Sequence, residues 1–124
     1  MRVFGEFKMG IKRVALEIGQ GTSLRTGDYT RAAKRAIENA LWRNSLSMAE
    51  VFGFSKNDMI VDVVIGVQCP EEVRLSSLEE LFPYGKVKIK SELGGLDISK
   101  TDSTGKTIIA IAVLIISFDM EIQS

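Results

Sequence analysis

The chain has 124 residues, of which 45% are hydrophobic, enough for one domain with a packed core. Lysine and arginine together number 16, as do aspartate and glutamate, so no net charge draws the chain to nucleic acid or to an anionic membrane. It contains no histidine and a single cysteine, Cys69. This excludes the common zinc and non-haem iron ligand sets within one chain, as well as serine–histidine and cysteine–histidine nucleophile pairs.

The same composition bears on location and domain organisation. One cysteine permits no intrachain disulfide and is typical of a reducing compartment. The first ten residues, MRVFGEFKMG, carry charges and no long apolar run, so we expect no secretory signal and a cytoplasmic protein. We predict one domain over residues 1–124 without a metal or cofactor, in which residues 1–10 form either an edge strand or a loose segment.

Residues 14–18 alternate in the manner of a strand with one buried face. The face predicted to point inward consists of Val14, Leu16 and Ile18. Glu17 is predicted to point the other way. Gly19 and Gly21 interrupt the pattern, so we predict that they end the strand and begin a loop.

A helix is predicted to begin after Asp28, whose carboxylate can accept hydrogen bonds from the free N–H groups of the first turn. Apolar side chains then recur at helical spacing and form one stripe. The stripe consists of Ala33, Ala36, Ile37, Ala40 and Leu41. Because alanine is small, we expect this helix to pack very close to a sheet.

Basic residues gather around the start of this helix, where the helix dipole favours anions. They are Arg25, Arg31, Lys34 and Arg35. Free N–H groups with arginines nearby are suited to bind an anion or a carbonyl oxygen. The alternative interpretation is a solvated helix face, which costs about 0.3–1 kcal/mol per charge.

Two further segments predict strands. Residues 58–68 alternate and are rich in β-branched side chains, and Pro70 prevents the strand from continuing. Their shared face consists of Met59, Val61, Val63, Ile65 and Val67. Residues 86–92 alternate again, with Val87 and Ile89 predicted to point inward.

The remaining segments predict short helices and loops. Residues 48–54 are expected to form a helical turn, and residues 75–82 a short helix that begins at Ser76 or Ser77. Residues 94–95 and 99–106 are expected to form loops, because they are rich in glycine and polar side chains.

Residues 107–118, TIIAIAVLIISF, are apolar on both faces. The segment is too short to span a bilayer as a helix, which needs about 20 residues, and its β-branched composition predicts a central strand covered on both sides. Two helices can cover one side, and the other side needs a partner. We therefore predict an α+β fold: a four-stranded sheet with two helices packed on one face and the other face covered by oligomerisation.

Five runs in the chain resemble, in their order and spacing, a small family of bacterial and archaeal proteins described as conserved hypothetical. The runs are I-G-Q-G (residues 18–21), G-D-Y-T-R-A-A (27–33), V-V-I-G-V-Q-C-P-E-E-V (63–73), L-F-P-Y-G-K (81–86) and G-G-L (94–96). The resemblance covers most of the chain after residue 10.

That family is in turn similar to one structural unit of the ring-opening amidohydrolases, the cyanuric acid hydrolase and barbiturase group. There, three α+β units in one chain form a three-fold, barrel-like assembly, with a serine–lysine dyad and one arginine per unit around a central substrate. The resemblance implies that Arg31 faces a central ligand and that a single-unit protein assembles as a homotrimer. Gln20 stands where that group has its lysine, and V-Q-C-P (residues 67–70) where it has its serine, so both dyad residues are missing.

Two functions remain open, and the sequence does not decide whether the protein is catalytic. The first is a binding protein or enzyme that holds a small polar or anionic ligand between the subunits of a trimer. Its candidate ligand-binding residues are Arg31, Gln20, Gln68, Cys69, Arg25 and Lys34. The second is a non-catalytic assembly or regulatory module. Cys69 is alternatively a small buried hydrophobe, and we expect no nucleic acid partner because no aromatic residues interleave the basic cluster.

Overall fold

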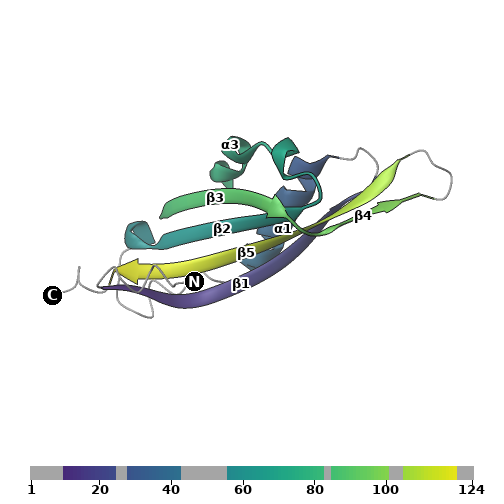
Figure 1. Cartoon of the computed structure of the whole chain (residues 1–124). Coiled ribbons are helices and arrows are strands. Elements are labelled where there is room, and N and C mark those ends of the chain that lie inside the picture. Colours follow the sequence, from purple (N-terminus) through teal and green to yellow (C-terminus); the bar gives the residue numbers. More distant parts are fainter. Residues whose placement is uncertain (1–9, 25–27, 43–55, 83–84, 101–104, 120–124) are drawn as a thin grey trace.

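The computed structural model describes residues 10–24, 28–42, 56–82, 85–100 and 105–119, which form a mixed sheet with helices on one face (Figure 1). The strands are β1 (Ile11–Ser23), β2 (Ile60–Val67), β3 (Lys86–Leu93), β4 (Leu96–Ser99) and β5 (Lys106–Asp119). The helices are α1 (Tyr29–Trp42) and α3 (Leu75–Leu78), with the 3-10 turns η3 (Lys56–Asp58), η4 (Pro70–Glu72) and η5 (Glu79–Leu81). The predicted α+β class is confirmed, but the sheet has five strands rather than four.

The strand order β1-β5-β2-β3 places β5 in the centre of the sheet, as its apolar sequence predicts. β5 pairs antiparallel with both β1 and β2, whereas β2 and β3 are parallel. The additional strand β4 pairs antiparallel with the first part of β5. The loop predicted over residues 99–106 is therefore too long, since Ser99 and Lys106 are paired strand residues.

β1 does not end at its glycines, because Gly19 and Gly21 are the positions where α1 lies on the strand. A Cβ at Gly19 would lie 2.3 Å from the carbonyl oxygen of Ala36, and one at Gly21 would lie 2.3 Å from the Ala36 nitrogen. Only glycine allows the two backbones to approach this closely. The expected close packing of helix on sheet is confirmed, and the predicted strand end is wrong.

The predicted inward face of β1 is correct for Val14, which packs against the core, and wrong for Leu16 and Ile18. Leu16 and Ile18 are 48% and 52% exposed, and they point away from the helices. Glu17 pairs with Leu114, which is fully buried, so Glu17 lies on the helix-covered face. The strand has apolar residues on both faces. The helix α1 covers the face on which Gly19 and Gly21 leave room for its backbone.

The core lies between the sheet and α1. The alanine stripe of α1 is buried as predicted, with Leu41 half-buried at its end. The alternate residues of β2 predicted to share a face are all buried, and Val87 and Ile89 of β3 pack against them. The short helix predicted near residue 75 is α3 continued by η5, and it begins at Leu75 rather than at Ser76 or Ser77.

β2 and β4 both lie beside β5, but along different stretches of it. β2 pairs with residues 111–117 of β5, and β4 pairs with residues 106–109. β2 therefore leaves the sheet where β4 enters it. We call this region, residues 66–69 and 94–97, the crossing.

The backbone is tightly packed at the crossing. A Cβ at Gly94 would lie 3.1 Å from the Gly66 Cα. Gly95 has a φ of +63°, and a Cβ there would lie 2.1 Å from the carbonyl oxygen of Ile109. The side-chain amide of Gln68 donates to the carbonyl oxygens of Gly94 and Gly95 at 3.1 and 3.2 Å. These contacts fix where the chain re-enters the sheet.

Some predictions lie outside the described residues: the helical turn at residues 48–54, the state of residues 1–9 and the position of Arg25. Among the helices that are described, none has the length and apolar character needed to cross a membrane.

Candidate functional site

Three ionisable side chains from three elements form a hydrogen-bonded cluster beside the crossing. The hydroxyl of Tyr29 donates to Asp97 Oδ2. Lys106 Nζ donates to the Tyr29 hydroxyl oxygen at 2.8 Å and lies 3.2 Å from Asp97 Oδ2. The ammonium also lies 5.0 Å from the centroid of the Tyr29 ring, within the range of a cation–π contact. We call this group the Tyr29–Asp97–Lys106 cluster.

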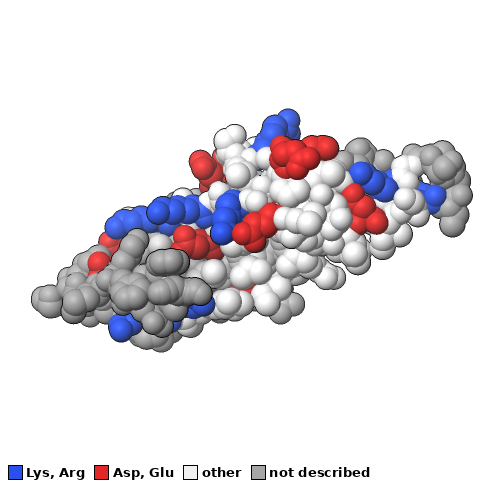
Figure 2. All heavy atoms as spheres, viewed as in Figure 1, with Lys and Arg blue, Asp and Glu red and all other residues white. Residues whose placement is uncertain are grey.

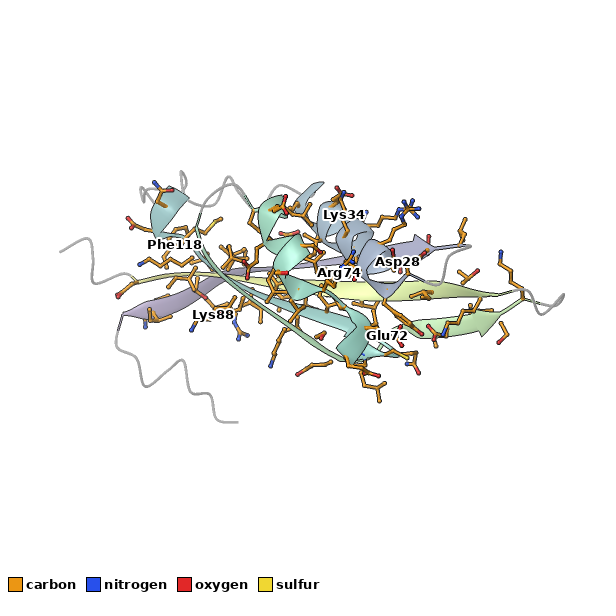
Figure 3. All side chains as sticks on the ribbon, turned by 90° about the horizontal axis from the view of Figure 1, so that it is seen from above. Asp28, Lys34, Glu72, Arg74, Lys88 and Phe118 are labelled. Carbon is orange, nitrogen blue, oxygen red and sulfur yellow. The ribbon has the colours of Figure 1, made fainter. Side chains whose placement is uncertain are left out.

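Helix capping places Tyr29 in the cluster. Asp28 Oδ1 accepts the backbone N–H of Arg31 at 3.1 Å, which confirms the predicted N-cap. Tyr29 is therefore the first helical residue. Seen from above, Asp28, Glu72 and Arg74 lie around this end of α1, whereas Lys34 lies further along the helix (Figure 3).

Strand register places the other two members. Asp97 pairs with Ile108, which is fully buried under the helices. Lys106 precedes Ile108 by two residues in β5, so the side chains of Asp97 and Lys106 lie on this same covered face. The β4–β5 hairpin thus brings a carboxylate and an ammonium under the start of α1.

The environment holds Tyr29 neutral. The residue is 3% exposed, and burial is the main cause that raises the pKa of its phenol, followed by the hydrogen bonds to Asp97 and Cys69. The hydrogen bond from Lys106 acts in the opposite direction and is outweighed. The same bonds to Tyr29 and Asp97 raise the pKa of Lys106, which therefore keeps its proton at neutral pH.

The cluster has unused hydrogen-bonding capacity. Asp97 Oδ1 is buried and has no hydrogen-bond partner among the described residues. An ammonium has three N–H donors, and the two contacts above account for two of those of Lys106. The side chains of Lys106 and Asp97 are 40% and 21% exposed, so they form the accessible side of the cluster, with Tyr29 behind them.

Cys69 links the cluster to the turn η4. Its side chain contributes to the raised pKa of Tyr29, and its sulfur and the carboxylates of Glu71 and Glu72 lie within 4.8 Å of one another. One thiolate and two carboxylates are potential ligands of a divalent cation. However, both glutamates are exposed, and exposed acidic groups often gather without an ion. We therefore assign no metal to this group.

Hydrogen bonds hold η4 against α1 and β3. The Thr30 hydroxyl accepts the backbone N–H of Arg74 at 2.9 Å and donates to the carbonyl oxygen of Glu72 at 3.5 Å. The Ser91 hydroxyl donates to the carbonyl oxygen of Pro70 at 2.9 Å. The segment after β2 is thus fixed beside the cluster.

The structure places the sequence-predicted site residues in different regions. Gln68 and Cys69 lie together at the crossing, the former exposed and the latter half-buried. Arg31 and Lys34 are exposed on α1. Arg25 lies outside the described residues.

Gln20 lies on β1, in a shallow hollow that also includes Ile18, Asn39 and Ile111. Its backbone N–H donates to Asn39 Oδ1 at 3.2 Å, and Arg35 donates to the carbonyl oxygen of Thr22 at 2.7 Å. Side chains of α1 therefore form hydrogen bonds with backbone groups at the outer edge of β1. This gives Arg35, one member of the basic cluster, a structural role.

Sequence reasoning missed all three members of the cluster. Tyr29 stands beside the predicted N-cap but was not singled out, and Lys106 was expected in a loop. Asp97 lies in a short strand that had no prediction. The available signal was the alternation of L-D-I-S (residues 96–99), in which an acidic residue stands between Leu96 and Ile98.

One protein family and one solved structure similar to this chain carry no stated activity. The family model for conserved hypothetical proteins called Lin0512 matches residues 13–116. An FtsZ-like protein of unknown function from Nostoc punctiforme PCC 73102 has a crystal structure similar to this one, with a TM-score of 0.78 and 31% sequence identity. The match covers 90% of this chain and 98% of that chain. No curated protein matches, and neither similarity supports the resemblance to ring-opening amidohydrolases.

Proposed function

The chain belongs to the Lin0512 family of conserved hypothetical proteins, and we propose that it binds a small polar molecule at the Tyr29–Asp97–Lys106 cluster. The observation that carries this proposal is the unpaired, buried Asp97 Oδ1 beside an ammonium with an unused N–H. A buried acceptor without a partner is costly, about 1–3 kcal/mol. Such groups in a native protein are satisfied when a ligand or a water molecule supplies the donor.

The hydrogen-bonding pattern defines the ligand. Lys106 offers a donor and Asp97 an acceptor, so the ligand carries an acceptor and a donor close together, as an amide or ureide does. Oδ1 itself is covered, so the side chains around it have to move before a ligand can donate to it. The ammonium and the carboxylate offset each other in charge, which favours a neutral polar ligand over a strongly anionic one.

The position in the fold supports the proposal. The crossing lies at the carboxyl ends of β2 and β3, which are parallel, and ligands of α/β sheets commonly bind at such ends where neighbouring strands diverge. Gln68 and Cys69, two of the residues expected at a ligand site, lie at this place. Arg31 and Lys34 extend from the exposed side of α1, so the proposed site does not depend on them.

We propose binding rather than turnover because Tyr29, the group best suited to proton transfer, does not contact the ligand at this site. A neutral tyrosine bonded to a lysine can serve as a general acid only if it contacts the ligand. Tyr29 is 3% exposed and lies behind Asp97 and Lys106. Its role in the proposal is to hold these two side chains in place.

Thermal unfolding against a panel of small amides, cyclic imides, ureides, carboxylates and phosphates tests the proposal. A ligand at about 100 times its dissociation constant adds roughly 2.7 kcal/mol, which shifts the midpoint of a chain this size by several degrees. The shift is expected from amides or ureides and should be lost in Asp97→Asn and in Lys106→Met, each compared with its own unliganded midpoint. Lys12→Met, which removes an exposed lysine of β1, is the matched control and should keep the shift.

Two results would overturn this proposal. One is a panel in which no compound shifts the midpoint. The other is a shift that both cluster variants retain, which would locate binding elsewhere on the protein.

A further inference from the structure

The face of the sheet turned away from α1, here called the open face, presents a continuous apolar surface. Leu16 and Ile18 of β1 are 48% and 52% exposed, and Leu96 and Ile98 of β4 are 58% and 49% exposed. The alternate side chains of residues 109–115 in β5 lie between them, because the register pairs Leu16 with Ile115 and Leu96 with Ile109. Single exposed apolar residues are ordinary, but a contiguous patch of this kind marks an interaction surface.

A charged border runs along one side of the open face. β3 is the last strand of the sheet order, and its outward residues are Lys86, Lys88, Lys90 and Glu92, all exposed. Basic side chains gather along β3 in Figure 2, with acidic side chains next to them, and much of the surface beyond these is uncharged. The charge therefore changes sign along β3, from lysine at its beginning to glutamate near its end.

We propose that a second copy of this chain covers the open face, with the two sheets face to face and their strands running in opposite directions. Lys88 and Glu92 are each two residues from Lys90. A two-fold axis across the strands at the level of Lys90 therefore sets Lys88 of one copy opposite Glu92 of the other. The same axis brings the two Lys90 side chains together, and each of them lies 3.3 Å from Glu92 of its own chain.

The apolar surface fits the same axis. Val64 pairs with Lys90 in β3 and with Val113 in β5, so Val113 lies at the level of the axis. Asp62 then faces Gly66, which leaves room for its carboxylate. Such an interface is isologous, the commonest type among homo-oligomers, and gives the sheet the second apolar layer that sheets packed face to face provide.

The mass of the full-length protein in solution, measured by light scattering during size-exclusion chromatography, tests this proposal. We expect two chains per particle, and Val113→Asp should give a monomer because it places a charge at the centre of the interface. Circular dichroism of Val113→Asp checks that the variant is folded.

Charge reversal on β3 tests the arrangement without touching the apolar surface. Lys88→Glu should raise the dissociation constant of the dimer roughly tenfold, because each dimer contains the Lys88–Glu92 contact twice. The double variant Lys88→Glu/Glu92→Lys should restore it, and Lys34→Glu on the exposed side of α1 should leave it unchanged.

A monomeric wild-type protein would overturn the proposal and leave another segment or another protein as the occupant of the open face. A trimer, which the resemblance to three-unit enzymes implies, would overturn the two-fold arrangement. Failure of the double variant to restore dimerisation would also contradict it. None of these results depends on the ligand panel, so the interface and the ligand site are tested separately.

Discussion

Tyr29 and Asp97 are separated by 68 residues in sequence and joined by a hydrogen bond across the covered face of the sheet. The bond ties the first residue of α1 to β4, and Lys106 at the start of β5 contacts both partners. The position of α1 on the sheet and the position of the β4–β5 hairpin are thus coupled through one buried phenol.

The phenol of Tyr29 should ionise only well above the ordinary pKa of about 10 for tyrosine. The chain has two tyrosines, so a Tyr84→Phe variant leaves Tyr29 as the only phenol. Its phenolate absorbance near 295 nm should remain low at pH values where free tyrosine is fully ionised. Asp97→Asn should lower the pKa, because it removes the acceptor charge that stabilises the neutral phenol. An ordinary titration of Tyr29 would show that the cluster does not form.

The raised pKa of Tyr29 predicts how stability depends on pH. Above pH 10 the unfolded chain loses the phenol proton while the folded chain keeps it, so the free energy of unfolding should fall as pH rises. The fall is at most about 1.4 kcal/mol per pH unit for one group. Urea unfolding at pH 9, 10 and 11 measures it. Tyr29→Phe should show a smaller loss across this range, and equal losses in both proteins would rule out the linkage.

Tyr29→Phe should also lower stability at neutral pH. It removes a hydrogen bond to a charged acceptor and leaves the carboxylate with Lys106 alone, which should cost about 1–3 kcal/mol in urea unfolding. Ser77→Ala is the matched control, because it removes a side-chain hydrogen bond at an exposed position. The control should change stability by about 0.5 kcal/mol or less.

Gly19→Ala should strongly destabilise the protein, whereas Gly66→Ala should be tolerated. A Cβ at Gly19 would lie 2.3 Å from the backbone of α1, so the helix has to move away from β1, at a cost of about 3 kcal/mol or more. The nearest atom to a Cβ at Gly66 lies at 3.4 Å, an ordinary contact. Thermal unfolding of the two variants compares them, and similar midpoints would show that α1 does not lie on Gly19.

Much of the fold follows from local patterns. The apolar run at residues 107–118 predicts the central strand, and the alternation from Met59 to Val67 predicts the buried face of β2. Asp28 and the alanine stripe predict where α1 begins and which side it buries. These predictions succeed because period and capping depend on neighbours along the chain.

The failed predictions concern contacts between segments. Gly19 and Gly21 have the local character of a strand end, yet they continue β1 because α1 needs a surface without side chains. Leu16 and Ile18 alternate in the manner of a core face, yet they point outward. The strand β4 is short, and its pairing with β5 was not visible from its own residues.

The sequence by itself determined α1, β2 and the central strand β5, the lack of histidine in this chain and the family, because each depends on residue identity and spacing alone. Only the tertiary structure decided which face of β1 is covered and which ionisable groups meet. Tyr29, Asp97 and Lys106 share no sequence neighbourhood, and their hydrogen bonds exist only because α1, β4 and β5 are packed together.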